Sequence, residues 1–134
     1  MAHLETRTSS ELQAAIDHIA ANLELAPSTA RALVLEWRRF LRYADGGTEA
    51  LRPSQAIDRC WHSILGDSDL YTAVCLSEFG RYVHHYRAEG TSVASARYAR
   101  QAFESEGIHF DERFWPLVPA SDPCWSGEAP PPPG

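Results

Sequence analysis

The residues best suited to chemistry lie between Asp58 and His85. Asp58 and His62 are four positions apart, and on a helix this spacing puts two side chains on the same face. A carboxylate and an imidazole placed in this way can hold a metal ion, or the carboxylate can orient the imidazole for acid–base catalysis. The spacing equally suits a hydrogen-bonded pair that only lines the core. Asp58 and His62 are therefore candidate catalytic residues and candidate metal ligands.

Three further potential ligands follow in the sequence, namely Cys75 and the adjacent pair His84 and His85. Cys75 can face Asp58 from the next helix across a short turn, although a small buried apolar residue is the simpler interpretation of this cysteine. Adjacent residues on a helix point about 100° apart, so at most one histidine of the pair can face a given site.

Gly80 decides whether the histidine pair can reach His62. If the helix that carries Cys75 continues through Gly80 to Tyr86, His85 lies about 15 Å beyond Cys75, too far to share an ion. The apolar series at Leu76, Phe79, Val83 and Tyr86 favours this continuation. If Gly80 instead ends the helix in the left-handed conformation, the chain can turn back toward His62. A mid-helix glycine costs about 1 kcal/mol, which favours the break.

The candidate metal site accordingly contains His62, His84, His85, Asp58 and Cys75. These ligand types suit zinc, and imidazole with carboxylate also suits iron or copper. If the chain returns at Gly80, we expect the ring nitrogens of His62 and of His84 or His85 to lie roughly 3–6 Å apart or to be bridged by a metal or water.

Five segments with helical periodicity must position these residues. Each is bounded by residues typical of helix ends, such as serine at the start and glycine at the end. No alternating strand pair is visible, so the sequence predicts an all-α, bundle-like domain. The expected helices run from Ser10, capped with Gln13, to Leu23, from Pro27-Ser28 to Ala44, from Pro53-Ser54 to Leu65, from Ser68 or Asp69 onward, and from Ser92 to Glu106.

The last 16 residues differ from the rest in composition. Residues 119–134 hold six of the nine prolines and few apolar side chains, too few to form a core. The sequence therefore predicts one helical domain over residues 1–118 and a disordered, flexible tail over residues 119–134. The proline run suits a polyproline ligand, but it lacks flanking basic residues.

Composition excludes several classes of function. The chain has 134 residues with a net charge of −6, which argues against nucleic-acid binding. All 12 basic residues are arginine, so lysine Schiff-base chemistry and a P-loop are excluded. No apolar run reaches the roughly 20 residues of a membrane span, and Met1–Ser10 lacks the apolar region of an export signal. With three cysteines and no CxxC pair, we expect free thiols and a cytoplasmic protein.

The order of the candidate residues is similar to a known signature. Asp58, Trp61-His62, Tyr71, Cys75, Phe79-Gly80 and His84-His85, with Trp115-Pro116 later, resemble the pattern of small bacterial proteins in the glycine-rich domain-containing protein-like family. The resemblance covers about half of the chain, from Arg52 to Pro116. The function of that family is largely undefined, so the resemblance implies a polar site at these residues without implying an activity.

Two functions remain open at this stage. The first is a small metal-binding enzyme or accessory enzyme that acts on a small-molecule or peptide substrate. The second is a non-catalytic helical module that binds a protein or peptide and uses the Trp-His and His-His residues as structural hydrogen bonders. The remaining histidines, His3, His18 and His109, are expected at the surface.

Overall fold

The computed structural model describes residues 8–44, 53–85 and 93–116, and over these residues the chain is helical without strands. This confirms the predicted all-α class. The expected tail over residues 119–134, His3 and Cys124 lie outside the described residues. The helices are α1 (Ser10–Asn22), α2 (Pro27–Ala44), α3 (Gln55–Leu65), α4 (Ser68–Phe79) and α5 (Val93–Ser105), followed by the short 3-10 turn η2 (Glu112–Phe114).

The helix starts follow the local capping chemistry. The Ser54 hydroxyl accepts a hydrogen bond from the Ile57 N–H at 3.2 Å, and the Asp67 carboxylate accepts one from the Leu70 N–H at 3.1 Å. Pro27 occupies the first position of α2, where its missing N–H costs nothing. The predicted cap of α1 is wrong by one residue, because Ser9 rather than Ser10 accepts the Leu12 N–H.

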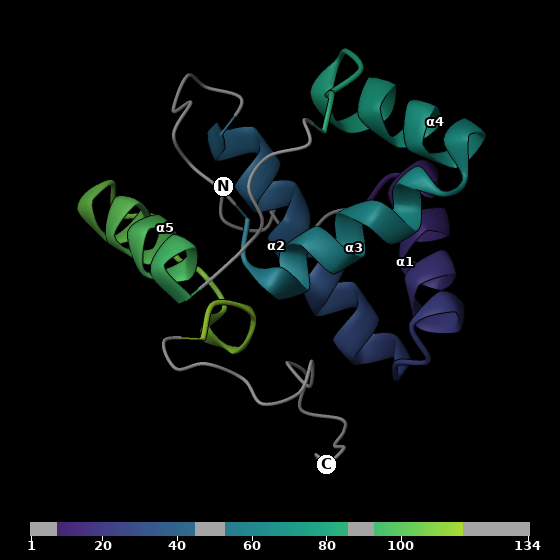
Figure 1. Cartoon of the computed structure of the whole chain (residues 1–134). Coiled ribbons are helices and arrows are strands. Elements are labelled where there is room, and N and C mark those ends of the chain that lie inside the picture. The colour runs from purple at the N-terminus through teal and green to yellow at the C-terminus, as the bar shows by residue number, and fades with distance from the viewer. Residues whose placement is uncertain (1–7, 45–52, 86–92, 117–134) are drawn as a thin grey trace.

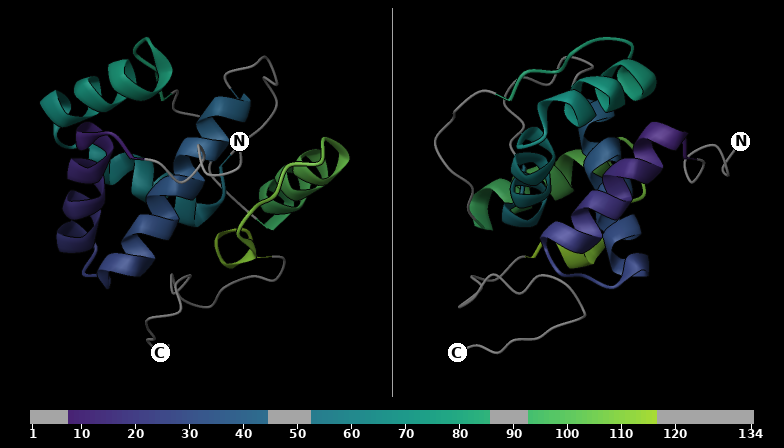
Figure 2. Two further views of the ribbon diagram at one scale, coloured as in Figure 1. Left: turned by 180° about the vertical axis from the view of Figure 1, so that it is seen from behind. Right: turned by 90° about the vertical axis from the view of Figure 1, so that its right-hand side faces the viewer.

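Helices α2 and α3 form the centre of the molecule. Helix α1 packs against α2, α3 and α4, while α3 also contacts α4 and η2. Figures 1 and 2 show α5 and the turn after it on the opposite side of the central pair from α1 and α4. The site-bearing helix α3 is thus held from several sides.

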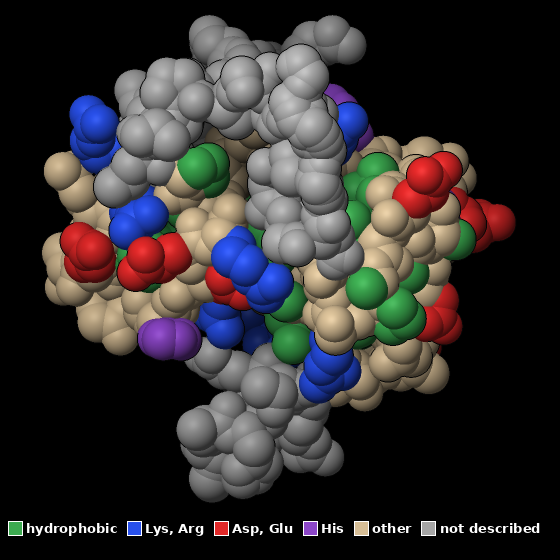
Figure 3. All heavy atoms as spheres, turned by 90° about the horizontal axis from the view of Figure 1, so that it is seen from below, with side chains coloured by type: hydrophobic (Ala, Val, Ile, Leu, Met, Phe, Trp, Pro, Cys, Tyr) green, Lys and Arg blue, Asp and Glu red, His purple; other side chains and the backbone are tan. Residues whose placement is uncertain are grey.

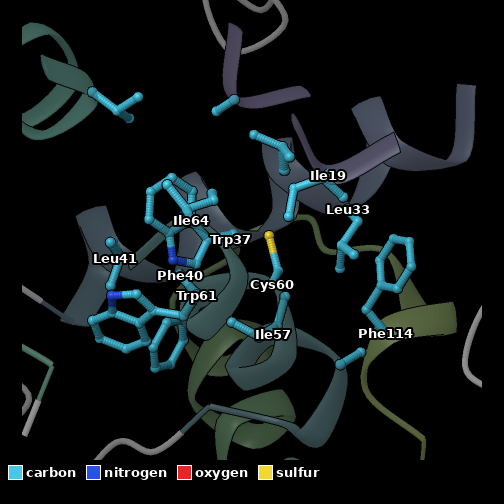
Figure 4. Packing of buried hydrophobic residues seen from close by; sticks show 14 of the residues in the cluster. Ile19, Leu33, Trp37, Phe40, Leu41, Ile57, Cys60, Trp61, Ile64 and Phe114 are labelled. Atoms are coloured by element: carbon cyan, nitrogen blue, oxygen red, sulfur yellow. The ribbon is translucent and has the colours of Figure 1, made fainter. Parts of the chain in front are cut away.

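The core is rich in large aromatic side chains. Trp37 and Phe40 from α2 pack close to Trp61 and Ile64 from α3, as Figure 4 shows. The Phe40 and Trp61 rings meet edge-on with 6.3 Å between their centroids. Phe40 also contacts the Trp115 ring, with 5.6 Å between centroids. Cys60 is fully buried here.

Candidate metal centre

Helix α3 presents Asp58 and His62 on one side, as their spacing predicts. The Asp58 Oδ1 and His62 Nε2 atoms are 3.7 Å apart. The Asp58 side chain is 27% exposed and the His62 side chain 62% exposed. The pair therefore lies at the edge of the core with its imidazole open to solvent.

The chain turns back after α4 and brings His85 to this pair. Helix α4 ends at Phe79, and Gly80 follows in the left-handed conformation with φ of 78°. Of the two paths open to the sequence, the structure takes the break at Gly80. The His85 Nε2 atom lies 2.8 Å from Asp58 Oδ1, within hydrogen-bond distance.

The returning segment is extended, so its side chains alternate. Val83 is buried and the His85 side chain is only 12% exposed, whereas Tyr82 and His84 are exposed. The His84 ring packs edge-on against the Tyr82 ring, with 4.9 Å between centroids. Of the two adjacent histidines, His85 is the one that faces Asp58.

Tyr71 fastens the returning segment to α3. Trp61 Nε1 donates to the Tyr71 hydroxyl at 2.9 Å, and this hydroxyl donates to the Val83 carbonyl. Burial raises the pKa of the Tyr71 phenol, so the hydroxyl keeps the proton that it donates. The His85 ring stacks on the Trp61 ring at 4.0 Å and 15°. Trp61 and Tyr71 together therefore fix the position and the orientation of the His85 imidazole.

The three side chains offer a metal two imidazole nitrogens and one carboxylate oxygen. One ligand atom from each of Asp58, His62 and His85 lies within 4.8 Å of the other two. Ligands about 2.0 Å from a tetrahedral ion lie about 3.3 Å apart. The observed 2.8 and 3.7 Å separations to Asp58 Oδ1 bracket this value. The third separation, between His62 and His85, lies within 4.8 Å, and the His62 side chain is exposed.

Two predicted ligands do not join this group. Cys75 is fully buried on α4, and the exposed His84 faces the Tyr82 ring. Among the residues that the structure describes, Asp58, His62 and His85 form the group of histidine, cysteine and acidic side chains close enough to hold one ion.

The histidines expected at the surface differ from one another. His109 is exposed. His18 is half-buried, and its Nε2 atom lies 2.9 Å from the Ser63 carbonyl oxygen, so the surface prediction is wrong for this residue. His18 links α1 to the end of α3 and has a structural role.

Sequence reasoning missed two carboxylates with buried side chains, Glu78 on α4 and Glu36 on α2. Glu78 accepts hydrogen bonds from Arg38 at 3.0 Å, Arg42 at 3.1 Å and Ser9 at 2.6 Å. Its partner Arg38 is 40 positions away in the sequence. This ion-pair cluster ties α4 to α2 immediately before the Gly80 turn.

Glu36 is the second buried carboxylate. Its Oε2 atom accepts the Trp115 indole N–H at 2.7 Å, and its Oε1 atom accepts the Asp111 backbone N–H at 3.2 Å and a guanidinium N–H of Arg39. Burial raises the pKa of Glu36 to about 7, and these donors oppose the rise. The sequence contained a sign of this burial, because Glu36 lies three and four positions from Leu33 and Phe40, which are on the buried face of α2.

Comparisons with protein-family models, with curated proteins and with solved structures find no match. The resemblance to the glycine-rich domain-containing protein-like family therefore stays a prediction. In the described parts of the chain, no helix combines the length and the apolar character that crossing a membrane requires.

Proposed function

We propose that this protein is a small metal-binding enzyme whose centre consists of Asp58, His62 and His85. The observation that carries the proposal is the convergence of two imidazole nitrogens and one carboxylate oxygen within 4.8 Å. Asp58 and His85 are 27 positions apart in the sequence. The turn at Gly80 and the hydrogen bonds of Tyr71 bring them together.

The number of ligands favours a catalytic over a structural centre. Structural zinc sites are closed by four protein ligands, whereas catalytic sites have three and leave a position for water or substrate. Two histidines and one carboxylate are also the set typical of mononuclear iron(II) enzymes. Bound there, a divalent ion would polarise a substrate oxygen or acidify a coordinated water.

Asp58, His85 and His62 would have different roles at this centre. Asp58 would contribute the negative charge and one oxygen ligand beside the two imidazoles. His85 is held against Trp61 and supplies a fixed ligand, whereas the exposed His62 can move as an ion or substrate enters. A small molecule or a peptide can approach, because the site lies at the surface. Two free, buried thiols, Cys60 and Cys75, suit a cytoplasmic location.

One observation favours the alternative, a non-catalytic helical module. His85 already has protein partners, among them the Asp58 carboxylate and the Trp61 ring. These contacts give His85 a structural role that needs no ion. The two functions differ in one measurable property, which is stoichiometric metal.

The test is the metal content and metal affinity of the full chain purified without a histidine tag. We expect about one divalent ion per chain, lost in His62→Ala and in Asp58→Asn. His62 is exposed, so its replacement leaves the fold intact. The matched control is His84→Ala, which removes an exposed neighbouring imidazole and should retain the metal.

Well-folded wild-type protein that binds neither zinc, iron(II) nor copper would overturn the proposal and support the helical module. Equal loss of metal in His84→Ala and His62→Ala would overturn the assignment of the ligands.

A further inference from the structure

A second feature with binding character lies on α2, in a groove of about 240 Å³. Its lining residues are Leu35, Arg38, Arg39, Arg42 and Tyr43 from α2, together with Ile108 from the segment after α5. The five α2 residues follow the three- and four-residue spacing of one helix face. The groove shares no residue with the Asp58, His62 and His85 group.

Among the described residues, the lining of the groove includes three basic side chains and no acidic one. Two carboxylates of the described residues form ion pairs with these guanidinium groups from outside the lining. Glu78 pairs with both Arg38 and Arg42, and Glu36 pairs with Arg39. The pKa of Glu36 is raised to about 7, so near neutral pH part of the population lacks the negative charge that faces Arg39.

The arginines differ in how firmly they are held. The Arg38 side chain is 4% exposed and is fixed by Glu78, so it forms a rigid floor. The Arg42 side chain is 46% exposed, so part of its guanidinium group is open to a ligand while it pairs with Glu78. A guanidinium group presents five N–H donors in a planar fork that matches a carboxylate or a phosphate.

The other walls of the groove are apolar. Leu35, Tyr43 and Ile108 are partly buried and pack against the core. The Tyr43 hydroxyl reaches the Ala102 carbonyl at 3.4 Å, which holds the ring beside α5. Figure 3 shows basic, acidic and apolar side chains intermingled on one face of the molecule. Apolar walls with a few polar groups are typical of sites for small molecules.

From this juxtaposition of arginines and apolar walls, we propose that the groove binds a small organic anion, with its acidic oxygens on Arg42 and Arg39 and its apolar body against Leu35 and Ile108. A volume of 240 Å³ is slightly below the roughly 300–1,000 Å³ of sites for drug-sized ligands. It suits a molecule of about the size of an aromatic acid. The anionic group is a carboxylate or a phosphate monoester, since both match the guanidinium fork.

The test is calorimetric titration of the full chain with 1-naphthoate, 1-naphthyl phosphate and the neutral 1-naphthalenemethanol. We expect both anions to bind with a Kd below about 1 mM and the neutral alcohol to bind at least about tenfold more weakly. Tighter binding of the phosphate would identify a phosphate ester as the ligand class, and tighter binding of naphthoate a carboxylate.

Two matched variants locate the site. Arg42→Gln should weaken binding of the anions about tenfold, and Arg59→Gln, which removes an exposed arginine of α3, should leave it unchanged. Circular dichroism checks that both variants fold; Arg42→Gln leaves Arg38 on Glu78. The proposal is overturned by absence of binding, by equal affinity for the neutral alcohol, or by equal effects of the two substitutions.

Discussion

The Tyr71 hydroxyl links the two parts of the candidate metal centre. It accepts from Trp61 on α3 and donates to Val83 in the segment that carries His85. Removal of this oxygen leaves a buried indole N–H and a buried carbonyl without a partner, which costs about 1–3 kcal/mol. Tyr71 therefore acts as a positioning residue for His85 and does not touch the ion.

We predict that Tyr71→Phe lowers zinc affinity about tenfold, as loss of a residue that orients a ligand does, while the helix content stays unchanged. Competition with a chelating dye gives the affinity, and circular dichroism gives the fold. Tyr98→Phe is the control, because Tyr98 is 48% exposed on α5. Unchanged zinc affinity in Tyr71→Phe would show that His85 is held without this hydrogen bond.

Glu36 makes the stability of the protein depend on pH. Its pKa is raised to about 7 in the folded state, so the folded chain holds a proton that the unfolded chain loses above about pH 4.5. The resulting contribution to stability is complete below about pH 4.5 and is lost as the pH rises through 7. It amounts to at most about 3 kcal/mol.

We predict that wild type loses stability relative to Glu36→Gln between about pH 5 and pH 8. Glutamine does not titrate. Its amide NH₂ group is a donor and would face one of the N–H groups that donate to Glu36 in wild type. Urea unfolding of both proteins at each pH gives the difference in their unfolding free energies. The contributions of the other titrating groups are the same in both proteins and cancel in this difference. A difference that stays constant with pH contradicts a raised pKa at Glu36.

At the scale of the elements, Gly80 controls the path of the chain. A Cβ atom at Gly80 would meet nothing within 4 Å, so the cost of a side chain there comes from the backbone, whose φ is 78°. This strain is roughly 1–2 kcal/mol for an alanine. Gly107 has φ of 72° and equally open surroundings at the end of α5, and so it provides a matched comparison.

We predict that Gly80→Ala and Gly107→Ala lower the unfolding free energy by similar amounts, about 1 kcal/mol. Gly80→Ala alone should also weaken metal binding, because it strains the turn that delivers His85. Thermal unfolding and zinc titration of the two variants separate these effects. Equal zinc affinity in both would mean that the turn at Gly80 does not set the position of His85.

The sequence predicts most of the helices because their ends are local. Ser54, Pro27 and Gly107 act within a few residues of their own position. The end of α4 was ambiguous because two local signals compete, the apolar series from Leu76 onward and Gly80. Leu76 is 57% exposed in the folded chain, so it belongs to no buried stripe, and only packing reveals this.

The site could be predicted only where its geometry depends on local sequence. The Asp58–His62 pair follows from helical spacing alone. The choice of His85 over His84 depends on which side chains of the extended segment face inward, and the burial of Val83 sets that alternation. The contacts of Glu36 with Trp115 and of Glu78 with Arg38 join residues 79 and 40 positions apart, and no local pattern encodes them.

At the scale of the whole molecule, the buried aromatic residues of the described core come from the helices and from η2 with the residue after it. We predict that deletion of residues 121–134 leaves the helix content and the melting temperature nearly unchanged, because this proline-rich stretch has few apolar side chains. Circular dichroism before and during heating checks this. Loss of cooperative unfolding would mean that Trp125 and Cys124 dock onto the domain.

The proposed function depends on Asp58, His62 and His85 binding one divalent ion together. The most direct measurement is a long-range ¹H–¹⁵N spectrum of the histidine rings, recorded as zinc is added to the full chain. We predict that the Nε2 signals of His62 and His85 alone, among the six histidines of the chain, move to metal-bound positions at one equivalent of zinc. Unchanged His62 and His85 signals at saturating zinc, or an equal response from His84 or His109, would contradict it.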